Sequence, residues 1–450
     1  MATAADSLAQ NLSFANFSKA TDLKKRLWFT IGALIVFRLC SFVPLPGIDP
    51  QALDQLFTQT SGGMLDFFNM FSGGALERMS IIALGIMPYI TASIVVQLMG
   101  SIYEPWKALK KEGESGRKKL NQYTRFGTVI LTIFQGYGIA VGLESWGAAS
   151  GASAVIDPGW FFRISTIITL LGGTLFLMWL GEQITSRGIG NGISLIIMAG
   201  IVAQVPVAIG GLFEQGRTGA ISAGFIIAVL VVGLGVIAFI CLMERAQRRI
   251  PIQYPKRQMG NRMFQGDTSH LPLKLNTAGV IPPIFASSLL LLPLTIAQFM
   301  GQEGGPDWLL TITTSLQHGA PLYMLLYAGG IIFFSFFYTA VVFNPDETAE
   351  NLKKHGGFVP GIRPGEKTSH YLDFVLTRIT VIGAAYLTLV CLLPEFLISQ
   401  MAIPFYLGGT SLLIVVNVTM DTVAQIQGHM LAHQYEGLIK KAKLRTGGRR

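Results

Sequence analysis

Few residues of this chain are arranged for chemistry, and the most suggestive arrangement lies at residues 361–368. They read GIRPGEKT, close to the phosphate-binding pattern G-x-x-x-x-G-K-[ST], with Lys367 and Thr368 in its last two positions. Glu366, however, stands where the second glycine belongs, and its carboxylate would crowd and repel a phosphate. We interpret the segment as a tight loop, shaped by proline and glycine, that presents Arg363.

Two further patterns fit metal or dinucleotide sites only in part. His429 and His433 share a helix face, but the glutamate of H-E-x-x-H is missing, which favours a polar helix beside a membrane. The run GIGNGIS at 188–194 begins an apolar stretch rather than the helix of a βαβ unit, which favours close backbone packing. The apolar stretches contain no Ser/His/Asp set and no paired carboxylates. We therefore predict no enzyme activity, no cofactor and no metal.

The composition is that of a membrane protein. Only 13% of the residues are charged and 51% are hydrophobic, with a mean hydropathy of +0.50, whereas soluble domains are about 25% charged. Roughly 20 apolar residues span a bilayer as a helix, and the stretches here are too long and too uniform for barrel strands. We predict an all-α polytopic protein with ten spans, at residues 27–43, 80–102, 126–143, 160–180, 189–212, 220–243, 275–300, 322–343, 374–393 and 403–420.

The basic residues predict the orientation of these spans. Most of the 34 Lys and Arg residues lie on alternate connections between the apolar stretches. Because cytoplasmic loops of membrane proteins are enriched in Lys and Arg, both termini are expected on the cytoplasmic side. The net charge of +9 fits this bias together with contact to anionic lipid, and also fits an acidic macromolecular partner at the basic loops.

The ten spans divide into five plus five. Two halves with an odd number of spans each, if related, have opposite orientations, and inverted repeats place a pathway at their interface. The expected organisation is a cytoplasmic N-terminal segment, a first half with helices 1–5, a second half with helices 6–10 and two large cytoplasmic loops, and a basic cytoplasmic tail. The corresponding residues are 1–26, 27–213, 214–424 with loops 244–274 and 344–373, and 425–450.

A short amphipathic helix is predicted between the first two spans. Gly62-Gly63 and Gly73-Gly74 flank a segment too short to cross a bilayer, and paired glycines relax the backbone at both ends. One face of this helix is apolar and carries Met64, Phe67, Phe68 and Phe71. Two interpretations remain open, a movable stopper in a pore and a helix lying on the outer membrane surface.

The polar residues inside the spans are mainly amides and hydroxyls. Intramembrane acids and histidines mark proton and ion relays, and the spans hold almost none, which disfavours a proton-coupled transporter. Arg38 is the main interior charge, and pairing with backbone carbonyls is its structural interpretation. The amides and hydroxyls could equally be ordinary bonds between helices. A five-plus-five transporter for small solutes is the second hypothesis, and an intramembrane enzyme the third.

Several strings of the chain resemble the SecY/Sec61-alpha family over nearly its whole length. They are FSGGALER at 71–78, ALGIMPYITASIVVQL at 83–98, KKEGESGRKK at 110–119, MWLGEQITSRGIGNGIS at 178–194, LPLKLNTAGVIPPIFASS at 271–288, FFYTAVVFNPDETAENLKK at 336–354, FVPGIRPGE at 358–366 and PFYLGGTSLLIVV at 404–416.

This resemblance implies a fold and a set of site residues. The fold is ten transmembrane helices in two inverted five-helix halves around an hourglass pore, with the plug at 62–75. The implied pore ring is Ile86, Ile90, Ile193, Ile197, Ile284 and Ile414. The seam between the halves, the lateral gate, is expected to include Thr91, Gln97, Gln135 and Asn276.

The resemblance also implies a function and partners. The implied function is a protein-conducting channel of the bacterial inner membrane, which passes unfolded secretory polypeptides and releases transmembrane segments sideways into lipid. A cytoplasmic motor or the ribosome supplies the work, with Lys256, Arg257 and Arg363 as contact residues. The implied partners are the small membrane subunits SecE and SecG, the SecA motor ATPase, the ribosome, polypeptides with a signal sequence, membrane lipids, YidC and SecDF.

Overall fold

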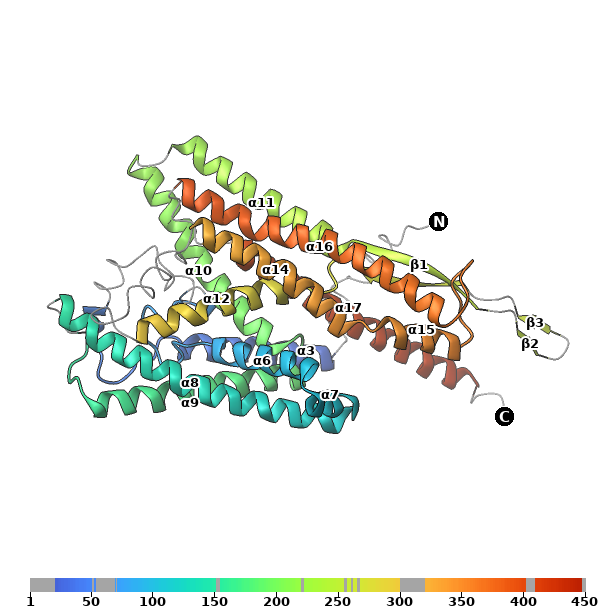
Figure 1. The fold of residues 1–450 in the computed structure, drawn as a ribbon, viewed down its shortest axis with the longest axis horizontal. Coiled ribbons are helices and arrows are strands. Elements are labelled where there is room, and N and C mark those ends of the chain that lie inside the picture. The colour runs from blue at the N-terminus through green and yellow to red at the C-terminus, as the bar shows by residue number, and fades with distance from the viewer. Residues whose placement is uncertain are drawn as a thin grey trace. The chain divides into compact units, whose positions relative to one another are not determined.

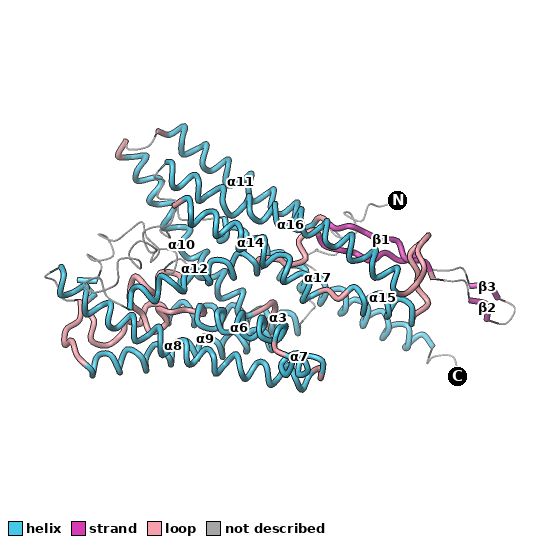
Figure 2. The backbone as a smooth tube through the Cα atoms, in the orientation of Figure 1, coloured by secondary structure: helices cyan, strands magenta, loops and turns pink. Residues whose placement is uncertain are grey.

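The computed structural model of the chain is mostly helical. It describes residues 21–50, 52–53, 69, 71–150, 154–219, 222–254, 257–259, 262–264, 268–299, 320–401 and 409–446. Within these residues the named strands are confined to the connection between α11 and α12, as Figures 1 and 2 show.

Every one of the ten predicted spans overlaps a helix. These helices are α3 (Thr21–Cys40), α6 (Met87–Ile102), α8 (Glu114–Ser150), α9 (Trp160–Arg187), α10 (Gly192–Arg217), α11 (Ala223–Arg245), α12 (Ile281–Phe299), α14 (Pro321–Val342), α16 (Glu366–Met401) and α17 (Gly409–Thr446). Among the described residues, 7 helical segments are long and apolar enough to cross a membrane, and Met87–Ile102 and Ile281–Leu290 are shorter apolar helices. The chain is therefore a multi-pass membrane protein by length and composition.

Two helices begin later than the apolar stretches predict. The stretch at 80–102 becomes helical only at Met87, because the chain before it runs through turns with positive φ at Gly74, Met79 and Gly85. Likewise the stretch at 275–300 becomes helical at Ile281, after Gly279 with its φ of 62°. The adjacent prolines 282 and 283 stand in the first turn of α12, where a missing N–H breaks no helical bond.

The chain folds as two compact units. The first comprises Met1–Ala92, Arg125–Val205 and Val418–Arg450, and the second comprises Ser93–Thr124 and Pro206–Asn417. Helices α6, α8, α10 and α17 each contribute residues to both units.

In the first unit, α8 and α9 lie side by side (Figure 1), and Gly136 of α8 packs closely against Ile167 of α9. A buried apolar cluster joins this helix pair to the connection between α3 and α6. Its members are Leu45, Ile48, Leu53, Leu76, Met79, Ala83, Leu84, Ala140, Leu143, Val155, Phe162 and Leu170. Isolated bridges from Pro44 to Ser80 and from Ile48 to Val155 connect the neighbouring loops to this cluster.

In the second unit, α14 packs between α12 and α16, and α11 contacts α16. A short helix, α15 (Pro345–Lys354), also lies against α16. Strand β1 (Gln247–Gln253) pairs antiparallel with β4 (Thr268–Lys274), with Gln247 opposite Lys274. A second hairpin joins β2 (Arg257–Met259) to β3 (Arg262–Phe264), beyond the end of β1 in Figure 1.

Apolar residues of these connections form a buried cluster with residues of α16. Ile250 and Leu273 of the hairpin are buried with Val359, Leu372 and Ile379. Gln253 and Phe358 exchange backbone hydrogen bonds of 2.9 and 3.0 Å, which attach the hairpin to the loop before α16. The loops predicted at 244–274 and 344–373 are therefore an ordered structure in their described parts.

Candidate functional site

The predicted plug is described at its C-terminal end, residues 69 and 71–75, whereas Met64, Phe67 and Phe68 lie outside the described residues. Phe71 is buried. The Ser72 hydroxyl donates to the Asn69 carbonyl at 3.1 Å and accepts from the Leu76 amide at 3.2 Å. Asn69 also exchanges two 3.0 Å hydrogen bonds with Glu77 through its side chain. This end of the plug is therefore a compact, hydrogen-bonded turn.

Arg38 connects this turn to α3. Its Nη1 donates a hydrogen bond of 2.6 Å to the carbonyl oxygen of Gly73. The guanidinium also lies over the Phe42 ring at 5.0 Å, and Arg78 approaches the same ring at 4.4 Å. The predicted pairing of Arg38 with a backbone carbonyl is confirmed.

Gly73 connects the turn to α10. A Cβ on Gly73 would lie 2.9 Å from the Cα of Gly200, and a Cβ on Gly200 would lie 2.9 Å from the carbonyl oxygen of Phe71. Such distances leave no room for a side chain at either position. The plug end therefore meets α10 backbone to backbone, and φ values of 71° at Gly73 and 81° at Gly74 also require glycine there.

The six isoleucines predicted to form the pore ring lie on four helical regions. Ile86 accepts a backbone bond from Ile90, so these two stand one turn apart at the start of α6. Ile193 and Ile197 likewise stand one turn apart on α10, and all four belong to the first unit. Ile284 of α12 and Ile414 of α17 belong to the second unit. Five of the six are buried and Ile193 is half-buried.

The predicted seam residues differ in their surroundings. The Thr91 hydroxyl bonds to its own helix, at Met87, and Gln97 is exposed with a 3.3 Å bond to Ser93. In the described part of the chain, the Gln135 Oε1 is buried with no hydrogen-bond donor. Thr91 and Gln135 belong to the first unit, and Gln97 to the second.

Asn276, the fourth seam residue, has a partner that sequence reasoning missed. Its amide donates at 2.6 Å to Glu244 and at 3.1 Å to the Gly279 carbonyl. Glu244 is a buried carboxylate at the end of α11. The sequence offered a signal for this partner, because Glu244 is an acid at the end of an otherwise apolar stretch, directly before Arg245.

The glycine-rich run at 188–194 forms the tight turn between α9 and α10. A Cβ on Gly192 would collide with the carbonyl of Gly181, and Gly190 has a φ of 87°. Side chains of other helices hold the turn: Thr30 of α3 accepts from the Ile189 amide at 3.1 Å, and Gln425 of α17 accepts from the Gly190 amide at 2.9 Å. The prediction of close backbone packing is confirmed.

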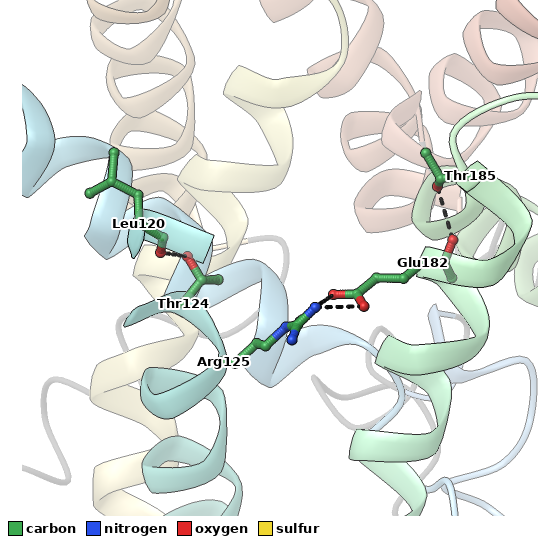
Figure 3. Close-up of polar contacts among 6 residues, drawn as sticks. Leu120, Thr124, Arg125, Glu182 and Thr185 are labelled. Carbon is green, nitrogen blue, oxygen red and sulfur yellow. Dashed lines mark hydrogen bonds and ion pairs between the residues drawn. The ribbon is translucent and has the colours of Figure 1, made fainter. Parts of the chain in front are cut away.

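Ion pairs join α8 and α9 near both ends. Arg125 Nη2 lies 2.7 Å from each carboxylate oxygen of Glu182, the contact drawn in Figure 3. Toward the other end, Arg163 Nη2 lies 2.6 Å from Glu144, which also accepts from the Gly159 amide at 3.0 Å. These pairs connect the two long helices at two separate levels along their length.

Arg363, predicted to contact a partner, is exposed between Gly361 and Gly365, whose φ values are 81° and 104°. Its carbonyl accepts a 2.8 Å bond from the buried Thr368 hydroxyl. That hydroxyl, which the phosphate-binding pattern would direct at a ligand, is thus engaged within the loop. Lys256 lies outside the described residues, and Arg257 is the first residue of β2.

Comparisons with known proteins identify the family. The family model SecY matches residues 80–423. Protein translocase subunit SecY of Escherichia coli K12 is 56% identical over 428 residues, which cover 95% of this chain and 96% of that protein.

Two solved structures have the same fold. One is of a SecY protein whose plug domain is described as stabilizing the closed state of the translocation channel; its TM-score is 0.65 at 20% identity, covering 90% of this chain and 92% of the other. The other is Sec61 in the canine ribosome–channel complex, with a TM-score of 0.64, 18% identity and the same coverages. The match of the family model and the 56% identity over 95% of the chain establish that the chain belongs to the SecY family.

Proposed function

We propose that this chain is a protein-conducting channel that passes unfolded secretory polypeptides across the bacterial cytoplasmic membrane. The observation that carries the proposal is the 56% identity to a translocase subunit over 95% of the chain. Transmembrane segments leave the channel sideways, because lipid solvates them better than an aqueous pore does. A cytoplasmic partner supplies the energy for transport, and both termini of the chain lie in the cytoplasm.

The constriction of the pore is the ring of six isoleucines. An apolar constriction sheds water and so blocks ions, while a branched apolar side chain yields around a passing polypeptide without binding it. All six ring positions hold isoleucine in this chain. The pairs on α6 and α10 stand at i and i+4, which presents each pair on one face of its helix.

The plug, residues 62–75, closes the pore from the outer side in the resting channel. The burial of Phe71 and the compact turn at 71–76 support a seated plug rather than a helix lying loose on the membrane surface. The similar SecY structure, whose plug domain is described as maintaining a membrane seal, supports the same assignment.

The seam residues Thr91, Gln97, Gln135 and Asn276 admit the signal sequence. The uncharged side chains of Thr91, Gln97 and Gln135 suit such a gate, because amide and hydroxyl contacts are broken and re-formed more readily than charged pairs. Asn276 differs, since its amide donates to the buried carboxylate of Glu244 at 2.6 Å. Binding of a signal segment and of a cytoplasmic partner then shifts the population toward the open state.

The cytoplasmic partners dock on the basic loops. The ribosome is supported by the similarity to Sec61 of a ribosome–channel complex, and the exposed tip residue Arg363 suits its phosphates. The SecA motor, the SecE and SecG subunits, YidC, SecDF and membrane lipids complete the proposed partners.

Site-specific crosslinking of a stalled secretory chain tests the proposal. Photoreactive probes at Ile86, Ile193, Ile284 and Ile414 are expected to capture the chain only when it carries a signal sequence. Probes at Ile227 and Leu230 serve as controls, because both side chains are exposed on α11. Only 11% of the apolar 18-residue segment of this helix is buried within the protein.

Absence of crosslinks at all four ring positions, in a folded and assembled complex, would overturn the proposal. Saturable uptake of a small solute by the same vesicles would then favour the transporter hypothesis.

A further inference from the structure

We propose that Arg38 is the latch that holds the plug in its closed position, through its hydrogen bond to the Gly73 carbonyl. This inference rests on the proposed channel function and adds to it a positioning residue outside the plug, the pore ring and the seam.

An interior arginine requires compensation. A charge within the membrane is costly unless it meets polar partners, and Arg38 lies within an apolar stretch of α3. The compensation is the Gly73 carbonyl at 2.6 Å, a short, charge-assisted hydrogen bond. Moving the plug end away from α3 would leave this guanidinium without that acceptor, so the closed position is favoured.

The acceptor stands at the place where the plug segment would turn. Gly73 and Gly74 both have left-handed φ values and directly follow the last helical residues of the segment, 71 and 72. A rotation at these two glycines would turn Phe71 and Ser72 and would also rotate the Gly73 carbonyl. Arg38 therefore bonds to the peptide group at the turning point.

The latch lies within one compact unit. Arg38, Gly73 and Gly200 all belong to the first unit, and Gly200 precedes the end of that unit's share of α10 by five residues, at Val205. The bond therefore joins two segments of the same unit.

Arg78 provides a matched comparison for Arg38. Both guanidinium groups lie over the Phe42 ring, at 4.4 Å for Arg78 and 5.0 Å for Arg38. The hydrogen bond to Gly73, by contrast, comes from Arg38. Neutralising either arginine removes one positive charge beside the same ring. Within the described residues, however, the change at Arg38 removes a hydrogen bond to the plug end, and the change at Arg78 does not.

The test uses the full channel complex, assembled with its small subunits, in sealed vesicles. Three variants are compared with wild type: Arg38→Gln, Arg38→Lys and the control Arg78→Gln. The measurements are ion leak without substrate, transport of a precursor with a weakened signal sequence, and thermal unfolding. Each vesicle batch is also tested with an intact precursor.

We expect Arg38→Gln to raise the resting ion leak about tenfold, equivalent to about 1.4 kcal/mol in the closed-to-open equilibrium. Transport of the weakened precursor should rise as well, while the intact precursor crosses normally. Arg38→Lys, which keeps a charged donor, should lie between Arg38→Gln and wild type. Arg78→Gln should match wild type in both leak and transport.

An Arg38→Gln complex with wild-type leak and wild-type transport of the weakened precursor would overturn the latch. Equal leaks in Arg38→Gln and Arg78→Gln would overturn it too, since local charge would then be the cause. Should Arg38→Gln not assemble, Arg38→Met replaces it, and failure of both to assemble would overturn the latch, because Arg38 would then be required for the fold itself. If wild-type vesicles carry no intact precursor, the proposed function fails instead.

Discussion

Gly73 and Gly200 meet so closely that a Cβ on Gly73 would lie 2.9 Å from the Gly200 Cα. Gly73 lies near the end of the predicted plug, residues 62–75, and Gly200 lies on α10, three residues after the predicted ring position Ile197. The plug and one wall of the predicted constriction are thus in direct backbone contact. A side chain at either glycine would have to displace the backbone of the other segment.

We predict that Gly200→Ala loosens the plug. The added methyl would meet the Phe71 carbonyl oxygen at 2.9 Å, and such overpacking costs about 1–3 kcal/mol. The expected result is a lower melting temperature and a higher ion leak in vesicles. Gly172→Ala is the control, because a Cβ there has nothing within 4 Å, and it should leave both unchanged. Equal behaviour of the two variants would contradict the close contact.

A second prediction concerns the pair of Glu144 and Arg163. These side chains are only 11% and 27% exposed, and Glu144 also accepts from the Gly159 amide. Glu144→Gln leaves the arginine without its counter-charge, so we expect a loss of about 2 kcal/mol of stability, measured by thermal unfolding of the solubilised complex.

The control for Glu144→Gln is Glu214→Gln. Its pair with Arg217 is exposed, at 57% and 80% for the two side chains, so its loss should change stability by less than about 0.5 kcal/mol. A larger effect of Glu214→Gln than of Glu144→Gln would show that burial does not set the strength of these pairs.

The pair of Arg125 and Glu182 should be weaker and sensitive to salt. The contact is bidentate, but the side chains are 50% and 38% exposed (Figure 3). A double-mutant cycle with Arg125→Ala and Glu182→Ala is expected to give a coupling of about 1 kcal/mol or less. Because mobile ions screen exposed charges, the coupling should fall at 1 M salt. A coupling that stays constant with salt would mean that the pair is shielded from solvent.

A fourth prediction concerns Arg363. The side chain of Arg363 is exposed at a loop tip, and the contact that holds this tip is a hydrogen bond from the Thr368 hydroxyl to the backbone carbonyl of Arg363. Arg363→Ala keeps that carbonyl and should therefore leave the fold unchanged. Binding to ribosomes should weaken, and the slope of log affinity against log salt should fall by about one for one lost phosphate contact. Arg217→Ala, expected on the opposite side of the membrane, is the control. Equal weakening by both variants would contradict a docking role of Arg363.

The sequence alone determined the class of this protein and the positions of its long apolar stretches. Burial in lipid requires long uninterrupted apolar runs, and this requirement acts on each segment separately, so it can be read from composition and length. Each of the ten predicted stretches overlaps a helix. The eight sequence strings also indicated the SecY family, which the 56% identity over 95% of the chain confirms.

The late starts of α6 and α12 could not be read from hydropathy. Residues 80–86 are apolar enough to be helical, yet they form turns, because the plug end must pass between α3 and α10 before the chain enters α6. The same holds for residues 275–280, where Asn276 turns back to bond with Glu244. In both places a contact with a distant segment decides the local backbone.

The partners of the interior polar groups were decided by the tertiary structure alone. Arg38 was evident in the sequence as a costly interior charge, but its acceptor is a backbone carbonyl, and any residue type supplies one. The same is true of Gly192 against Gly181 and of Gly73 against Gly200. Close contacts between backbones leave no trace in side-chain pattern beyond a glycine, so only the folded chain shows which two glycines meet.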